Sequence, residues 1–307
     1  MSRQIKNVVL AGATGSLGSH ILAALVRHGS FNITVLSRSA AASLPAGVTA
    51  KAVDFGSVTA LSEVLQGQDA VVDAISSPDP SVSIRLIDAA VTAGVYRYIA
   101  PEFSNDPENQ LTRALPVFGG KKQIYDYLLK VASEHEMTWT AVSNGAFLDW
   151  GLRMGFVNID LLNKKVVLMN DGSHVLPWTA LSAVGTAVAN TLAKPEKTKN
   201  QTCYIYSVLK SQNDIVAIAK DALGAVDWEI DSQDMEDVYA KAMAAVNSGD
   251  YSWNVMGDLI RYSISTPGYS GRFEQDHNDL LGVRPMSDEE VKCLVKEISN
   301  DLKAAKK

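Results

Sequence analysis

The chain has 307 residues, 47% of them hydrophobic and 20% charged, so it can bury one large core or two packed units. A net charge of −6 and a pI near 5.4 argue against the basic footprint of a nucleic-acid-binding protein. Two distant cysteines argue against a disulfide framework, and five scattered histidines without ligand spacing predict no metal site. Because no segment resembles a signal peptide or a membrane span, we expect a cytoplasmic protein that does not bind a membrane.

The chain begins with a short apolar strand, a glycine-rich turn and a helix, within residues 5–18. An apolar run at 8–11 predicts a buried strand, and apolar residues then recur every four positions, as on one face of a helix. Three evenly spaced glycines lie between the two elements, in the pattern G-x-x-G-x-x-G. A plain structural turn has the same composition, but this order of elements favours a dinucleotide pyrophosphate on the helix N-terminus. The expected contacts are Gly12, Thr14, Gly15, Ser16, Leu17 and Gly18.

Strand and helix patterns alternate through the first half of the chain. Further strands are predicted at 33–36, 48–53, 70–75, 96–100 and 138–142, and helices at 57–65, 84–91 and 120–134, with a polar loop at 102–116. This alternation predicts an α/β fold with a Rossmann-type, doubly wound parallel sheet. We expect residues 1–145 to form a dinucleotide-binding domain to which 181–224 return, and 146–307 to form a smaller, mainly helical substrate-binding part.

The end of the second strand distinguishes the two nicotinamide cofactors. An NAD site needs a carboxylate there for the ribose 2′-hydroxyl, whereas an NADP site needs a cation for the 2′-phosphate. The sequence provides Arg38 and no acid before Asp54. A guanidinium can bind a phosphate through two hydrogen bonds, so we predict NADP(H), although a solvated surface arginine would look the same. The next two strand ends add candidate cofactor contacts at Asp54, Phe55, Ser76 and Ser77.

An ordered set of motifs then points to a known family. GATGSLG, SRS, APEFSNDP, LPVFGGKKQIYDYL and AVSNGAF resemble the NmrA-like and isoflavone reductase-like family, an atypical branch of the short-chain dehydrogenase/reductases. The resemblance covers roughly residues 5–225, and its LPVFGGK segment looks like that of fungal members. It implies an NADP-dependent oxidoreductase of secondary metabolism, leaves a homodimer open, and adds cofactor contacts at Pro101, Phe103, Lys121, Asn144 and Phe147.

The family's catalytic lysine falls in an F-x-x-K segment, which here ends at Lys121. Lys122 follows immediately, so the sequence leaves a one-residue ambiguity, in which we prefer Lys121. A lysine buried beside a cofactor can lose its proton near neutral pH and act as a general acid or base. The Y-x-x-x-K pair of ordinary members is absent from this helix, which fits the atypical branch. Ser104 stands where glycine is usual, so it must avoid a positive φ or be strained.

The alternation loosens after residue 145, where aromatic residues collect. We expect an apolar substrate pocket lined by Phe147, Trp150, Met154 and Trp178, each of which can equally belong to the core. The resulting hypothesis is an NADPH-dependent reductase of a small apolar or aromatic molecule, with hydride from nicotinamide C4 and Lys121 handling the proton. Two alternatives stay open. One is a dinucleotide-binding regulator with a protein partner and no turnover, and the other is an isomerase or cyclase with a spectator nicotinamide.

Overall fold

The computed structural model describes residues 3–39 and 44–306. Within them, a main sheet of seven parallel strands runs in the order β3-β2-β1-β4-β5-β6-β11. The strands are β1 (Asn7–Ala11), β2 (Asn32–Ser37), β3 (Val48–Ala52), β4 (Ala70–Asp73), β5 (Arg97–Ile99), β6 (Thr138–Ser143) and β11 (Gln201–Tyr204). The order reverses between β1 and β4, which is where doubly wound sheets bind ligands. The predicted Rossmann-type fold is confirmed.

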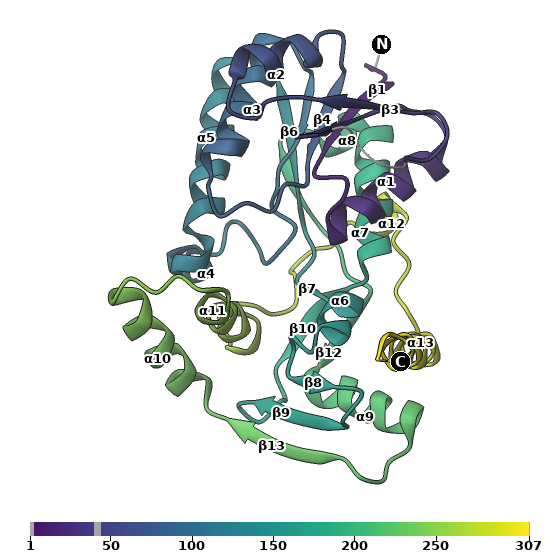
Figure 1. The fold of residues 1–307 in the computed structure, drawn as a ribbon, viewed down its shortest axis with the longest axis vertical. Coiled ribbons are helices and arrows are strands. Elements are labelled where there is room, and N and C mark those ends of the chain that lie inside the picture. The colour runs from purple at the N-terminus through teal and green to yellow at the C-terminus, as the bar shows by residue number, and fades with distance from the viewer. Residues whose placement is uncertain (1–2, 40–43, 307) are drawn as a thin grey trace.

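Helices cover both faces of this sheet, as Figure 1 shows. One layer holds α1 (Ser16–His28), α7 (Leu181–Ala193) and α8 (Pro195–Thr198), and the other holds α2 (Val58–Leu65), α3 (Ser81–Thr92) and α5 (Gly119–Glu134). Successive side chains of β1 point to opposite faces of the sheet, so that Val8 and Leu10 pack on the α1 side and Val9 and Ala11 on the other. Helices on both faces are therefore needed to bury this apolar strand. All four residues are fully buried.

The loop predicted at 102–116 contains two short helical segments, α4 (Gln110–Ala114) and the 3₁₀ helix η1 (Pro116–Phe118). The Asn109 side chain accepts a hydrogen bond from the Thr112 N–H and so caps α4. Pro116 provides the fixed φ that suits a helix start, and η1 leads directly into α5. These segments hold the start of α5 against the sheet edge that carries the site.

Most of the rest of the chain lies beyond the carboxyl edge of the main sheet (Figure 1). Its helices are α6 (Leu148–Arg153), α9 (Gln212–Leu223), α10 (Met235–Asn247), α11 (Trp253–Ser265) and α13 (Asp288–Ala305), whereas α12 (Asn278–Leu281) packs on α7 beside the main sheet. Two small sheets, which the sequence pattern did not predict, join β12-β10-β7 and β13-β9-β8. Their strands are β7 (Ala146–Phe147), β8 (Ile159–Asp160), β9 (Lys165–Met169), β10 (Val175–Thr179), β12 (Val208–Ser211) and β13 (Glu229–Gln233).

The predicted return of 181–224 to the main sheet extends only to Tyr204. α7 packs on α1, and β11 pairs with β6, so both belong to the nucleotide-binding sheet. β12 instead pairs antiparallel with β10, and α9 packs in the separate core of the C-terminal part. Across the described residues, no helix is both long enough and apolar enough to span a bilayer.

Candidate cofactor and active site

Only glycine fits at two positions where β1 leads into α1, one in the turn and one in the first turn of the helix. Gly12 has φ +87°, and a Cβ on it would lie 2.4 Å from the Ala74 carbonyl oxygen. A Cβ on Gly18 would lie 2.0 Å from the Gly12 carbonyl oxygen. α1 has no side-chain cap and no acidic residue in its first turn, so its N-terminal N–H groups are available to an anion. This turn therefore fits the pyrophosphate of a dinucleotide.

A hollow of about 580 Å³ lies at the ends of β2 and β3. It contains the predicted contacts Arg38, Asp54 and Phe55, together with Arg85 from α3, which the sequence analysis did not identify. The Arg85 Nε donates to the Phe55 carbonyl at 2.8 Å, and its Nη1 donates to Ser81 Oγ at 2.8 Å. The only sequence signal for Arg85 was a position near the start of a predicted helix, which does not reveal the direction of a side chain.

The end of β4 combines exposed and buried polar groups. Ser76 and Ser77 are exposed after this strand, in a position to contact a ligand. Asp73, which ends the strand, is fully buried and accepts hydrogen bonds from Tyr98 Oη at 2.8 Å and from the Ile75 N–H at 3.0 Å. Burial raises the pKa of Asp73, which its hydrogen bonds and the charge of Lys121 oppose. Sequence reasoning missed this carboxyl because it lies inside an apolar strand.

The two adjacent lysines at the start of α5 have different environments. The Lys121 Nζ is partly buried and donates to the carbonyl oxygens of Pro101 at 2.5 Å and Glu102 at 2.8 Å, where β5 ends. Burial lowers the pKa of Lys121, the charge of Glu102 opposes this shift, and the charge of Arg113 adds to it. Lys122 is exposed and pairs with Asp126. Of the two, Lys121 therefore lies at the carboxyl edge of the sheet.

A buried ion pair fixes the segment that holds Lys121. Arg113 and Glu102 are 5% and 1% exposed, and their closest N–O distance is 2.7 Å. The Arg113 Nε also donates to the Pro107 carbonyl at 2.9 Å, and its guanidinium lies 5.5 Å from the Tyr125 ring centre. Removing one partner of such a pair leaves an uncompensated buried charge, so the pair constrains residues 101–113 strongly. Sequence reasoning missed it because its partners are eleven positions apart, across irregular backbone.

The loop after β5 places its strained residue at Phe103, with φ +28°, rather than at Ser104. Ser104 avoids a positive φ, as expected, and its carbonyl accepts hydrogen bonds from the N–H groups of Asn144 at 3.0 Å and Gly145 at 3.2 Å. Phe103 is 7% exposed and packs in the core on the α1 side. Pro101 is buried as well, so the contacts expected of these two residues would come mainly from backbone.

Asn144 and Phe147 follow β6, next to the β5 loop. Asn144 is fully buried, its Nδ2 donates to the Gly145 carbonyl, and its Oδ1 is a buried acceptor without a partner among the described residues. A buried acceptor without a hydrogen-bond partner is unfavourable unless a ligand donates a hydrogen bond to it. The carboxamide N–H of a nicotinamide could be that donor. Phe147 is half-buried against the α1-side core. With the glycine turn and Arg38, these residues fit a dinucleotide along one sheet edge.

Comparison with known proteins identifies the family. The sequence profile of the NmrA-like family matches residues 4–233. The chain belongs to the NmrA-like family. Oxidoreductase aprR of Aspergillus flavus is 31% identical over 291 residues, which cover 92% of this chain and 96% of the relative. The predicted resemblance is thus confirmed.

Solved structures similar to this NmrA-like chain share its fold at low identity. An isoflavone reductase superposes with a TM-score of 0.74 at 18% identity, over 97% of this chain and 100% of that one. The leucoanthocyanidin reductase–NADPH complex from Vitis vinifera superposes with a TM-score of 0.76 at 16% identity, over 94% and 99%. At these identities the likeness establishes the fold alone.

The residues expected to line a substrate pocket have different environments in this NmrA-like structure. Trp178 is fully buried, and its Nε1 donates to the Lys210 carbonyl at 2.9 Å. It lies on β10, the central strand of its small sheet, and therefore belongs to the core of the C-terminal part, so its assignment to an open pocket was wrong. Met154, by contrast, is 63% exposed at the end of α6.

Trp150 instead takes part in an aromatic cluster between α6 and α11. The ring centres of Trp150 and Phe156 are 5.2 Å apart, and those of Phe156 and Trp253 are 6.1 Å apart. The Arg261 guanidinium lies 5.1 Å from the Phe156 ring centre. Trp253 is 65% exposed, so the cluster presents aromatic surface to solvent. Phe156 and Trp253 were not among the predicted residues, because their proximity depends on how α11 packs.

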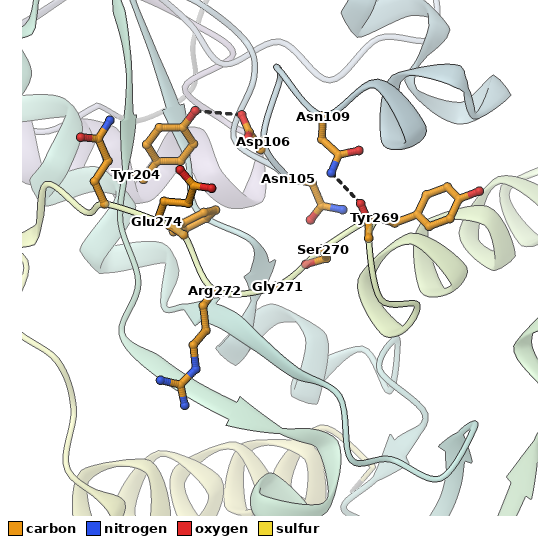
Figure 2. Close-up of a pocket in the computed structure, with 12 residues that line it drawn as sticks. Asn105, Asp106, Asn109, Tyr204, Tyr269, Ser270, Gly271, Arg272 and Glu274 are labelled. Carbon is orange, nitrogen blue, oxygen red and sulfur yellow. Dashed lines mark hydrogen bonds between the residues drawn. The ribbon is translucent and has the colours of Figure 1, made fainter.

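A separate polar pocket of about 330 Å³ lies between residues 105–109, Tyr204 and the loop at 268–275 (Figure 2). Tyr204 Oη donates to Asp106 Oδ1 at 2.9 Å, and Asn109 Nδ2 donates to the Gly268 carbonyl at 2.8 Å. None of the four predicted substrate residues lines it. In the part of this NmrA-like chain that the structure describes, no group of three or more His, Cys, Asp or Glu residues is arranged to hold a metal.

Proposed function

We propose that this protein is an NADPH-dependent reductase of a small apolar or aromatic metabolite, with Lys121 as its general acid. The position of Lys121 carries the proposal, because its ammonium group is held at the sheet edge where the dinucleotide-binding residues gather. Its relative aprR is named an oxidoreductase, and its structural neighbour from Vitis vinifera is an NADPH complex. The first supports an oxidoreductase, and the second supports the use of NADP(H).

Different residues at the sheet edge would bind different parts of the dinucleotide. The N–H groups at the start of α1 would bind the pyrophosphate, Arg38 the 2′-phosphate and Asn144 the nicotinamide end. When bound, NADPH supplies a hydride from C4 of its nicotinamide. Lys121 Nζ would donate a proton to the substrate atom that becomes negatively charged. The substrate would thus gain two electrons and one proton as the hydride from NADPH and a second proton from Lys121, and water would reprotonate the lysine.

The substrate side is proposed to lie in residues 146–307, beyond the carboxyl edge of the sheet. The cluster of Trp150, Phe156 and Trp253 offers flat aromatic surface there. Offset or tilted ring contacts stabilise an aromatic ligand beyond the burial of its area. This supports an aromatic or otherwise apolar substrate over a strongly charged one.

The function is tested by following NADPH absorbance at 340 nm with a panel of quinones, aryl ketones and aryl-conjugated alkenes, with product analysis of each mixture. The proposal expects NADPH oxidation in step with formation of the reduced product. Conversion of a compound without NADPH loss would instead identify an isomerase or cyclase. Tight NADPH binding with no conversion, together with specific capture of one protein partner, would identify a regulator.

The cofactor preference is expected to depend on Arg38. The wild-type protein should bind NADPH more tightly than NADH, because a guanidinium near the 2′-phosphate gives a charge-assisted pair worth about 1.5–3 kcal/mol. Arg38→Asp should weaken NADPH binding by about 10–100-fold, which corresponds to the same range of free energy, and leave NADH binding largely unchanged. Fluorescence titration of both nucleotides measures this, and a wild-type preference for NADH would contradict it.

The pH dependence of the reduction rate should report the protonation state of Lys121. A general acid must be protonated, so the rate should fall as pH rises through the pKa of Lys121, which burial places below the ordinary lysine value of about 10.4. In the oxidation direction the lysine acts as the base, and the rate should rise across the same pH range. Initial rates in both directions test this, and identical pH trends in the two directions would contradict the assigned role.

A further inference from the structure

Arg38 and Arg85 reach the 580 Å³ hollow from different elements, the end of β2 and the helix α3. Among the described ion pairs, neither arginine has a carboxylate partner. Arg38 is exposed and free to follow a phosphate, whereas Arg85 is only partly exposed. The two cations therefore differ in exposure, and this difference fits different tasks in the same hollow.

The orientation of Arg85 is fixed by two hydrogen bonds. Nε and Nη1 donate to Phe55 O and Ser81 Oγ, which anchor the guanidinium between the β3 end and the start of α3. Its Nη2 has no acceptor among the described residues. A planar cation that is held in place offers a face to a flat ring, and arginine stacks on such rings with both cation–π and dispersion attraction.

The remaining walls of the hollow suit a purine. Phe55 is half-buried and adds an apolar ring to the lining. Asp54 accepts the Gly56 N–H on Oδ1, and its Oδ2 has no donor among the described residues, so it can accept from an exocyclic amine. A carboxylate at this place would repel a phosphate, so the phosphate and the base should lie at different ends of the hollow.

We infer that Arg85 forms a wall of the adenine pocket, with its guanidinium against the base, while Arg38 alone pairs with the 2′-phosphate. The inference rests on the proposed dinucleotide cofactor, but it concerns binding of the adenosine end and is independent of any turnover. A protein that binds adenosine nucleotides as described but reduces nothing would refute the reductase proposal and leave this one standing.

The test measures the affinity of the full-length protein for 2′,5′-ADP and for 5′-AMP by calorimetry. Arg85→Ala should weaken both ligands by a similar factor of about tenfold, because both contain adenine. Arg38→Ala should weaken 2′,5′-ADP by about tenfold or more and leave 5′-AMP unchanged. A loss restricted to 2′,5′-ADP in Arg85→Ala, or no loss for either ligand, would overturn the inference.

Two further variants guard against a merely structural effect. Arg27→Ala removes an exposed arginine from the last turn of α1, and it should leave both affinities at the wild-type level. Arg85→Lys keeps the positive charge and a long aliphatic side chain but removes the planar guanidinium. It provides the test of the inference if Arg85→Ala fails to fold. Weakened binding of both ligands in Arg85→Lys supports stacking, whereas wild-type affinity for both means that charge alone matters and overturns the assignment.

Discussion

Replacing Lys121 with alanine should lower kcat for NADPH-dependent reduction by about 10²–10⁴-fold, the range that a general acid contributes. NADPH affinity should change little, because the ammonium group of Lys121 is bound by protein carbonyls rather than by the glycine turn or the Arg38 hollow. The substitution also removes a partly buried cation, and with it the free-energy cost of desolvating that charge. Steady-state rates give kcat, and quenching of protein fluorescence by NADPH gives the affinity.

Lys122→Ala is the matched control for this experiment. Lys122 is the next residue on the same helix, but it is exposed and its only described ion pair is with Asp126 at i+4. Exposed pairs of this kind contribute about 0.3–0.5 kcal/mol, so the variant should fold and turn over like the wild type. Full activity of Lys121→Ala, or a loss in Lys122→Ala as large as in Lys121→Ala, would show that the proton comes from elsewhere.

The proposed dinucleotide-binding edge was predictable because a parallel sheet gathers its strand ends in one place. Gly12, Arg38, Asp54 and Asn144 are far apart in sequence, yet each follows a strand whose apolar run could be recognised. Once the order of strands and helices predicts parallel pairing, the carboxyl ends must share an edge. Their convergence in the structure therefore required no knowledge of side-chain packing.

The residues that surround this edge were not predictable, because their roles depend on packing between distant elements. Arg85 lines the hollow only because α3 packs with this face towards the β3 end. Trp178 shows the same limit in reverse, since an aromatic residue carries the same sequence signal in a core as in a pocket. The short β8 and the exposed, polar β13 lack the apolar alternation that reveals a strand.

Gly18→Ala should destabilise the protein strongly and weaken NADPH binding with it. A helical position normally gains up to about 1 kcal/mol when alanine replaces glycine. Here the added Cβ would lie 2.0 Å from the Gly12 carbonyl oxygen and 2.8 Å from its carbon, so the backbone of the turn must move. We expect a net loss of about 3 kcal/mol or more in the free energy of unfolding, the upper end for overpacking, measured by urea denaturation.

Gly15→Ala separates this steric effect from a general sensitivity of the turn. Gly15 is exposed, its φ of −75° suits any residue, and a Cβ on it would lie 3.4 Å from the Gly12 carbonyl oxygen. Its stability should therefore stay within about 1 kcal/mol of the wild type, the cost of alanine at a helix N-cap. Since α1 must approach the Gly12 backbone closely to present its N–H groups to a pyrophosphate, NADPH should stabilise the wild type against urea but not Gly18→Ala. Equal urea midpoints for Gly15→Ala and Gly18→Ala would contradict this explanation, because they would show that the glycine at position 18 is not needed for the close approach of α1 to the end of β1.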